Sequence, residues 1–295
     1  MKVVRKEDLK SIGAERKRAR PGSLEVTQLM VGTPGTPGNF YFTLGSTQSD
    51  YHTPRHRHNF EQIRVQLRGE FDYERDGKMT EGTVGYFPEG AFYGPSRSGD
   101  GSVILLLQFG GASGRGYMSY DEYAQGLASL SQRGSFHDGI YTWLDSTGKK
   151  HNKDGYEAVW EESRQTDLNY PKPRYEKPIF MRPENFSWQS SPDEAGVAFK
   201  RLGTFSEREV HVGLVRLDAG VNTSQLPGGA LYFVLSGKGS AAGESWHAES
   251  ALHLDRHESA EICAMEQSEL FYIGLPNLDG LAVPTHRHQI IAAAA

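Results

Sequence analysis

The chain of 295 residues is about twice the length of a typical domain, which predicts two domains. Its 37% hydrophobic and 23% charged residues can build a core and do not indicate disorder. The net charge of −5 excludes a generally basic nucleic-acid surface. The sequence contains no run of about 18 apolar residues that would indicate a membrane span. Because Cys263 is the single cysteine, no internal disulfide can form, and we expect a cytoplasmic protein.

The first 24 residues form a polar lead-in, and we interpret the basic run at 16–20 as a solvated arm rather than a phosphate site. From residue 24 to 111, short β-type runs alternate with Gly, Pro and Asp, for example at 40–44, 63–67 and 103–109. The run at 103–109 is apolar on both faces, which predicts a buried central strand. Asp76-Gly77 predicts a hairpin turn.

The middle of the chain indicates helices. Ser119 and Glu122 have the spacing of a capping box, which predicts a helix that extends to Arg133 with Gly134 as its C-cap. A second short helix is expected over 156–164, and the segment 171–174 is a proline-rich linker. We therefore expect a mixed helical and turn insertion without a further sheet.

The β pattern resumes near residue 179, most clearly at 210–217, 231–235 and 270–275. Two sets of short strands around an irregular middle predict an all-β protein of two tandem modules. We expect a first barrel with its lead-in at 1–112, a connecting segment at 113–175 and a second barrel at 176–291. The four terminal alanines are left out of the fold assignment.

The residues that point to chemistry lie between positions 52 and 69. Side chains on a strand alternate between its faces, so His56, His58 and Gln62 would project to one side and Glu61 to the other. Two imidazoles two residues apart can reach one metal ion. Alternatively, both imidazoles hydrogen-bond a ligand or neighbouring side chains in a polar pocket.

The same segment resembles the cupin superfamily, whose motifs are usually written G-x5-H-x-H-x3/4-E-x6-G and G-x5-P-x-G-x2-H-x3-N. The residues that match the motifs are His56, His58, Gly69, Gly82, Pro88 and Gly90. The departures are Asp50 for the leading glycine, Gln62 for the glutamate, Tyr93 for the third histidine and Arg97 for the asparagine. The resemblance implies two double-stranded β-helix (jelly-roll) barrels, that is, a bicupin.

The resemblance also implies a metal site of His56, His58 and Gln62, with Tyr93 at the position of the third histidine. One divalent transition metal, Fe, Mn, Ni, Cu or Zn, would be the cofactor. An amide and a neutral phenol are weaker ligands than carboxylate and imidazole. Tyr93 or His52 would move a proton during catalysis.

Further candidates follow from the same alternation. Arg64 and Gln66 have the parity of Gln62, and a guanidinium near the site would attract a carboxylate. A bulge would invert this parity, and Arg64 would then lie in a surface ion pair or at the rim. Phe60 and Tyr86 could supply aromatic walls of the substrate site, or could pack in the core.

The second module lacks such a site. Aligning Gly237 with Gly69 places Ser224, Leu226 and Ala230 at the ligand positions. We expect this degenerate module to cover edges of the first barrel or to support a homodimer. His286 and His288 repeat the spacing of the first pair, but we interpret them as part of a surface tail.

Two main functions remain open. A metal-dependent enzyme would act on a small polar or acidic molecule, by dioxygenase-type cleavage or as an isomerase or lyase. A non-catalytic bicupin would hold a small ligand by hydrogen bonds, and a structural or storage role is a third possibility. We expect a small-molecule ligand or substrate as partner, and neither nucleic acid nor membrane.

Overall fold

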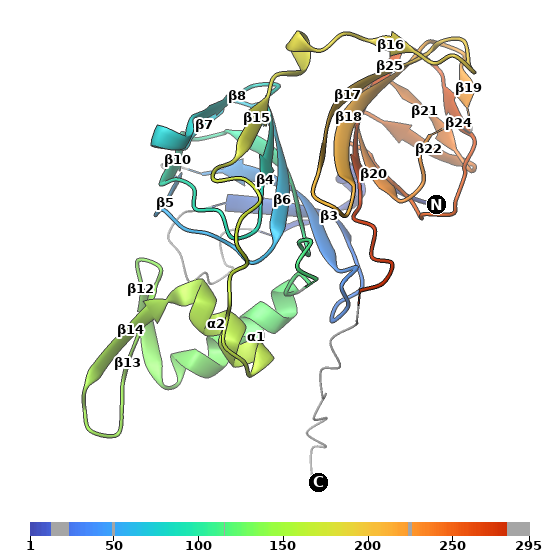
Figure 1. Ribbon diagram of the computed structural model, residues 1–295. Helices are drawn as coiled ribbons and strands as arrows, with labels where there is room; N and C mark the ends of the chain where they lie inside the picture. The colour runs from blue at the N-terminus through green and yellow to red at the C-terminus, as the bar shows by residue number, and fades with distance from the viewer. Residues whose placement is uncertain (13–23, 49–50, 115, 224–225, 282–295) are drawn as a thin grey trace.

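The computed structural model describes residues 1–12, 24–48, 51–114, 116–223 and 226–281. The basic run at 16–20, Asp50, Ser224, the tail histidines and the terminal alanines lie outside these ranges. In the described part, two β-barrels lie side by side, and a small helical unit lies against the first barrel (Figure 1). The all-β tandem architecture predicted from the sequence is confirmed.

The first barrel combines a seven-stranded antiparallel sheet, in the order β15-β9-β6-β11-β4-β3-β2, with a four-stranded sheet, β5-β10-β7-β8. As predicted, the strand at 103–109 is central and buried, between β6 and β4. The strands are β2 (Ser11–Ile12), β3 (Leu24–Val31), β4 (Phe40–Thr47), β5 (Tyr51–Thr53), β6 (Glu61–Arg68), β7 (Glu70–Asp72), β8 (Lys78–Thr80), β9 (Val84–Phe87), β10 (Ser96–Ser98), β11 (Val103–Phe109) and β15 (Ile179–Met181).

The second barrel repeats this plan, with sheets β1-β23-β20-β25-β18-β17-β16 and β19-β24-β21-β22. Its strands are β1 (Lys2–Val4), β16 (Gln189–Ser190), β17 (Val197–Phe205), β18 (Val210–Leu217), β19 (Asn222–Thr223), β20 (Ala230–Ser236), β21 (Lys238–Ala241), β22 (Glu244–His247), β23 (Ala251–Leu254), β24 (Ile262–Ala264) and β25 (Ser268–Gly274). Short 3₁₀ turns lie at Lys6–Asp8, Glu74–Asp76 and Pro183–Asn185.

Each barrel receives an edge strand from outside the segment expected to form it. The N-terminal strand β1 pairs with β23 of the second barrel, although residues 1–112 were expected to form the first. The strand β15, from the expected second module, pairs with β9 of the first barrel. Both strands cover a sheet edge that would otherwise expose unpaired backbone groups.

The two seven-stranded sheets share one hydrophobic core. Ile63 and Val65, on the outward face of β6, belong to the same buried cluster as Val212 and Phe233 of the second barrel. The ring of Tyr86 stacks on that of Phe205, with their centroids 4.2 Å apart. Because these contacts bury apolar surface of both barrels, they should stabilise the pair as one unit.

The interior of the second barrel is packed with apolar side chains. Tyr232 and Trp246 are almost fully buried there, and Leu226 and Ala230 belong to the same cluster. Leu226 and Ala230 were aligned with two of the first barrel's ligand positions, so in this module those positions form core.

The helical unit is formed by α1 (Tyr120–Ser131), β12 (Gly134–His137), β13 (Ile140–Leu144), β14 (Lys150–Asp154) and α2 (Gly155–Arg164). The capping box of Ser119 and Glu122 is present, and the second helix was correctly predicted. Two expectations were wrong, because Gly134 begins β12 rather than capping α1 and because the insertion contains a three-stranded sheet. The sheet forms because its apolar face, with Tyr141 and Trp143, packs against the helices.

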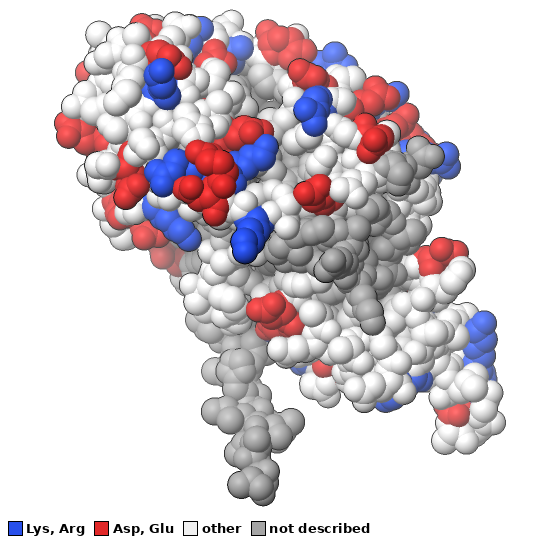
Figure 2. All heavy atoms as spheres, turned by 180° about the vertical axis from the view of Figure 1, so that it is seen from behind, with Lys and Arg blue, Asp and Glu red and all other residues white. Residues whose placement is uncertain are grey.

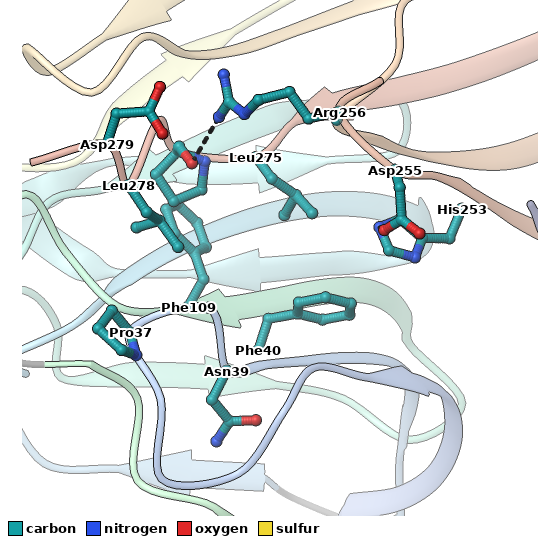
Figure 3. Close-up of a pocket in the computed structure, with 13 residues that line it drawn as sticks. Pro37, Asn39, Phe40, Phe109, His253, Asp255, Arg256, Leu275, Leu278 and Asp279 are labelled. Carbon is teal, nitrogen blue, oxygen red and sulfur yellow. Dashed lines mark hydrogen bonds and ion pairs between the residues drawn. The ribbon is translucent and has the colours of Figure 1, made fainter. Parts of the chain in front are cut away.

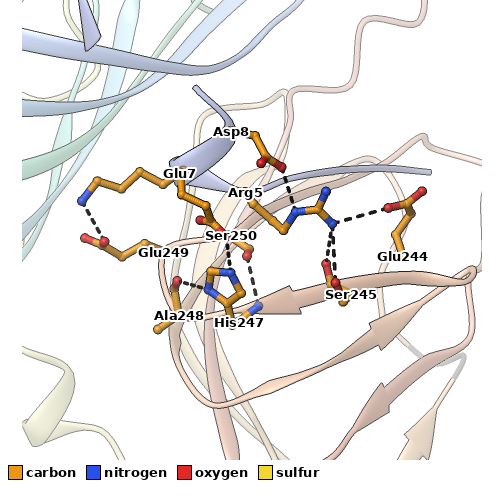
Figure 4. Close-up of polar contacts among 10 residues, drawn as sticks. Arg5, Glu7, Asp8, Glu244, Ser245, His247, Ala248, Glu249 and Ser250 are labelled. Carbon is orange, nitrogen blue, oxygen red and sulfur yellow. Dashed lines mark hydrogen bonds and ion pairs between the residues drawn. The ribbon is translucent and has the colours of Figure 1, made fainter. Parts of the chain in front are cut away.

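The start of the chain is fastened to the second barrel by polar contacts (Figure 4). Lys6 Nζ lies 2.7 Å from Glu249 Oε2, and His247 Nε2 lies 2.6 Å from Glu7 Oε1. On the face shown in Figure 2, acidic and basic side chains are intermixed over this barrel. Within the described ranges, neither helix is long and apolar enough to cross a membrane.

Candidate functional site

The strand β6 separates the interior of the first barrel from the core between the barrels. Gln62 pairs with Phe87 of β9, and Arg64 with Gly85, and the side chains of Gln62 and Arg64 point into the barrel. Ile63 and Val65 point the opposite way, into the shared core. The alternation predicted from the sequence therefore holds along this strand.

The two histidines lie in the loop that leads into β6, not on the strand itself. The strand begins at Glu61, so the prediction that one strand carries His56, His58 and Gln62 was wrong. Instead His56 forms an isolated β-bridge with Tyr93, with backbone N···O distances of 3.0 and 3.1 Å. This bridge brings the histidine loop over the barrel interior, where the imidazole centroids of His56 and His58 are 4.9 Å apart.

A chain of hydrogen bonds selects the tautomer of the neutral His56 imidazole. Its Nδ1 lies 2.6 Å from the carbonyl oxygen of Pro54, which can only accept, so Nδ1 carries a proton. In a neutral imidazole Nε2 is then an acceptor, and the Tyr93 hydroxyl, 3.0 Å away, donates to it. The Tyr93 oxygen in turn accepts from Gln62 Nε2 at 3.3 Å and from Arg64 at 3.1 Å.

The guanidinium of Arg64 lies at the centre of this network. It donates two hydrogen bonds to Gln62 Oε1, at 2.6 and 2.9 Å, and one to the Tyr73 hydroxyl at 2.7 Å. Its carbon lies 4.2 Å from the ring centroid of Phe87. No carboxylate of the described residues forms an ion pair with it. Burial opposes its charge, but the tyrosine hydroxyls, first that of Tyr73, raise the pKa of Arg64 above its usual value.

Above Arg64 is a cavity of about 240 Å³. Residues of the helical unit and of the segment just before it line the cavity: Tyr156 of α2 donates to Asn59 Oδ1 at 2.9 Å, and Tyr117 donates to Gln108 Oε1 at 3.0 Å. The lining residues are Leu24, Val26, Tyr41, Thr43, Tyr51, Thr53, His58, Phe60, Gln62, Arg64, Leu106, Gln108, Tyr117, Met118, Tyr120, Tyr123 and Tyr156. Among these, Arg64 is the one side chain with a permanent charge.

The structure distributes the remaining candidate residues differently. Phe60 lines the cavity and stacks on His58, with centroids 4.3 Å apart. Gln66 points inward but lies at the far end of the strand, where it donates to Ser102 Oγ at 2.7 Å. His52 is exposed on β5, whereas its neighbours Tyr51 and Thr53 line the cavity.

Tyr86 is also separated from the cavity, because it pairs with Ile63 and shares its outward face in the core between the barrels. Burial, and next the charge of Glu61, raises the pKa of Tyr86. Tyr86 faces outward because paired residues on adjacent strands point to the same face of the sheet. His52 does not share the direction of His56 because the loop after Pro54 interrupts the alternation along the chain.

No family model and no curated protein sequence matches the chain. Solved structures match the fold over nearly its whole length. A "putative dioxygenase" from Nostoc punctiforme superposes with a TM-score of 0.62 at 10% identity, over 96% of this chain and 85% of that one. A "putative glyoxylate induced protein" from Pseudomonas aeruginosa gives 0.57 at 11% identity, over 92% and 87%. A deletion mutant of Bacillus subtilis oxalate decarboxylase gives 0.50 at 11% identity, over 93% and 77%.

The chain has the bicupin fold. Since identities of 10–11% show the fold alone, the chemistry of the first cupin barrel has to be argued from its own residues.

The donor set of this cupin barrel does not fit a divalent metal ion well. The described residues contain no group of three or more His, Cys, Asp or Glu side chains that could hold a metal. Beyond the imidazoles of His56 and His58, the set offers the amide of Gln62 and the phenol of Tyr93, and both are hydrogen-bonded to Arg64. A metal ion bound there would lie close to the guanidinium, and like charges repel.

Sequence reasoning missed the residues that close the cupin barrel, chiefly Tyr117, Tyr123 and Tyr156. Tyr123 and Tyr156 belong to the helical unit and Tyr117 lies just before it, in a part of the chain without a counterpart in the cupin motifs. The concentration of tyrosines between positions 117 and 156 was the available signal, but spacing alone does not show that a helix packs over a barrel mouth.

Two buried carboxylates lie behind the cavity, on the outward side of β6. Glu89 accepts from the Ser113 amide at 2.8 Å and from Arg174 at 3.1 Å. Glu61 is fully buried, and among the described residues neither of its oxygens has a hydrogen-bond partner. Burial, and next the charge of Glu89, raises the pKa of Glu61 to about 7.

A second cavity, of about 170 Å³, lies where loops of the two barrels meet (Figure 3). Its lining includes Phe40, Phe109, His253, Asp255, Arg256 and Asp279. Arg256 already donates to the Pro276 carbonyl at 3.1 Å, and burial lowers the pKa of His253. Because its acidic and basic side chains offset one another, this cavity has no clear charge preference, and the cavity above Arg64 is the candidate site.

Proposed function

We propose that the first cupin barrel binds a small organic acid, whose carboxylate pairs with Arg64. The observation that carries this proposal is a permanently charged guanidinium at a cavity whose described lining contains no carboxylate. A charge removed from water is unfavourable unless an opposite charge or several hydrogen bonds compensate it. The hydrogen-bond partners of Arg64 given above, Gln62, Tyr73 and Tyr93, are all neutral. A bound carboxylate would supply the missing opposite charge, and hydrogen bonds between charged partners are stronger than neutral ones.

The size of the cavity and its other lining residues indicate the size and shape of the ligand. The cavity of about 240 Å³ is larger than the ~150 Å³ that suffices for benzene. Rings of Phe60, Tyr123 and Tyr156 form part of the wall, and offset or edge-on ring contacts favour a flat partner. A substituted aromatic acid of about benzoate size is therefore a suitable probe.

Calorimetric titration with benzoate, and with benzamide as its uncharged counterpart, tests the proposal. We expect benzoate to bind and benzamide to bind much more weakly. Arg64→Met should weaken benzoate binding by about 30-fold, which corresponds to about 2 kcal/mol for removing one partner of a buried charge pair. The matched control is Arg97→Met, at an arginine whose side chain is 68% exposed. This variant should bind benzoate as tightly as the wild type does.

The proposal fails if benzoate and benzamide bind equally, or if both arginine variants behave alike. In that case the charge of Arg64 does not select the ligand. Circular dichroism and thermal unfolding of each variant show whether the barrel is intact.

Metal-dependent catalysis is a second candidate, including dioxygenase-type cleavage. One observation favours it: the imidazoles of His56 and His58 do lie together, and the Nδ1 of His56 is anchored on a backbone carbonyl, as is common for ligating histidines. Elemental analysis of the purified protein tests it. One transition metal per chain, lost in His56→Ala, would favour the enzyme, whereas metal-free protein that binds benzoate would favour the binding module.

A further inference from the structure

Arg64 makes the contacts that a metal ion would need. Its guanidinium donates to Gln62 Oε1 at 2.6 and 2.9 Å and to the Tyr93 oxygen at 3.1 Å. These two oxygens are the ones that would have to complete a metal site beside the histidines. A guanidinium and a metal ion both attract oxygen lone pairs, so they compete for the same atoms.

The hydrogen bonds of the network run in one consistent direction. Arg64 donates to Gln62 and Tyr93, Gln62 Nε2 donates to Tyr93, Tyr93 donates to His56 Nε2, and His56 Nδ1 donates to the Pro54 carbonyl. Every member has a donor or acceptor that suits it. To bind a metal, Gln62 Oε1 would have to leave Arg64, and the Tyr93 proton would have to leave His56 Nε2.

Charge leads to the same conclusion. A divalent ion would add two positive charges beside that of Arg64, and the described lining of the cavity offers no carboxylate in compensation. Arg64 cannot lose its proton to relieve the repulsion, because a guanidinium is not deprotonated in proteins.

We propose that the guanidinium of Arg64 takes the place of the metal ion in the first cupin barrel, so that the side chains of His56, Gln62 and Tyr93 are organised around an organic cation. The inference rests on the proposed function only in that it concerns the same cavity, since it needs no ligand to be identified. If it is correct, this barrel works without a metal, and metal-dependent catalysis by it is ruled out.

Replacing Arg64 should turn the network into a metal site. In Arg64→Met and Arg64→Gln, the positive charge is gone, and the Gln62 and Tyr93 oxygens are released. The probe is Co²⁺, added to the full-length protein after treatment with a chelator and followed by its visible absorption. We expect each variant to bind Co²⁺ on the order of 10-fold more tightly than the wild type, or more, a change comparable to those caused by partners of metal ligands.

Two controls define the site. Arg64→Lys keeps a positive charge and should bind Co²⁺ no better than the wild type. Adding His56→Ala to either uncharged variant should abolish the gain. Arg97→Met, at an exposed arginine of the same barrel, should show none.

The inference is overturned if the wild type binds one Co²⁺ per chain at low micromolar concentration and His56→Ala abolishes that binding, a result that does not depend on any arginine variant folding. It is also overturned if the folded uncharged variants bind Co²⁺ no better than Arg97→Met. A failure of benzoate to bind would refute the proposed function and leave this titration unaffected.

Discussion

The buried carboxyl of Glu61 should make the stability of the protein depend on pH in a defined way. Its pKa rises from an ordinary 4.5 to about 7 in the fold, first because it is buried and next because Glu89 is near. At about 1.4 kcal/mol per pKa unit, this difference corresponds to about 3 kcal/mol. The fold favours the protonated form, so the contribution is complete below pH 4.5, decreases as the pH rises, and is lost above about pH 7.

The substitution Glu61→Gln isolates this contribution, because glutamine has a similar shape and no charge at any of these pH values. We expect the variant to gain stability relative to the wild type as the pH rises from 4.5 to 7.5, by up to about 3 kcal/mol. The assay is urea denaturation followed by circular dichroism at half-unit pH steps, and the quantity compared is the difference in unfolding free energy between the two proteins.

The control is Glu81→Gln, at an exposed glutamate in the turn before β9. It reports what a glutamate-to-glutamine change does without burial. A difference between Glu61→Gln and the wild type that stays constant across the pH range would refute the reasoning, since Glu61 would then titrate alike in the folded and unfolded chain.

Three further predictions concern the fold. Phe233→Ala, in the core between the barrels, should lower the unfolding free energy by about 3–5 kcal/mol in urea denaturation, through lost burial and the cavity left behind. Ser119→Ala removes the capping hydroxyl of α1 and should cost about 1 kcal/mol in the same assay. The carbonyl of Ala248, and next Glu7, raises the pKa of His247. The contact between His247 and Glu7 should therefore stabilise the fold while His247 is protonated and weaken as the pH rises through the pKa of His247. Measuring the His247 titration by NMR, with Glu7→Gln as the comparison, would show no difference if this contact is not the cause.

The sequence predicted those parts of the site that depend on strand periodicity. The alternation of faces placed Gln62 and Arg64 inside the barrel and Ile63 and Val65 outside, and β6 obeys it. The second motif placed Tyr93 at the position of the family's third histidine, and in the structure Tyr93 bridges to His56. These features are local, so a few residues are enough to specify them.

Features that depend on packing between distant segments were not predictable. His56 and His58 lie in a loop whose path is set by the bridge to Tyr93, not by a strand period. As an aromatic residue, Tyr86 was a candidate for the cavity wall. In the structure its ring stacks on Phe205 of the other barrel, more than a hundred positions away in the sequence. The closure of the cavity by Tyr156 needs the helical unit to dock, and this docking follows from tertiary contacts with Asn59.

The pairing of β1 with the second barrel and of β15 with the first also depends on contacts between segments that are distant in the sequence. A strand of three residues carries too little pattern to show which sheet it joins, and pairing is decided by which edge is open nearby. The boundaries at 112 and 176 were therefore drawn by composition, whereas in the structure the strands of the two barrels interleave at their edges.

The central claim, that Arg64 is the cation of a carboxylate-binding cavity in the first barrel, is tested most directly by crystallography with 4-bromobenzoate. The account predicts an anomalous bromine peak inside the cavity, with the carboxylate paired to Arg64 and no metal between His56 and His58. A metal peak at the histidines, or a cavity that stays without bromine at saturating ligand, would contradict it.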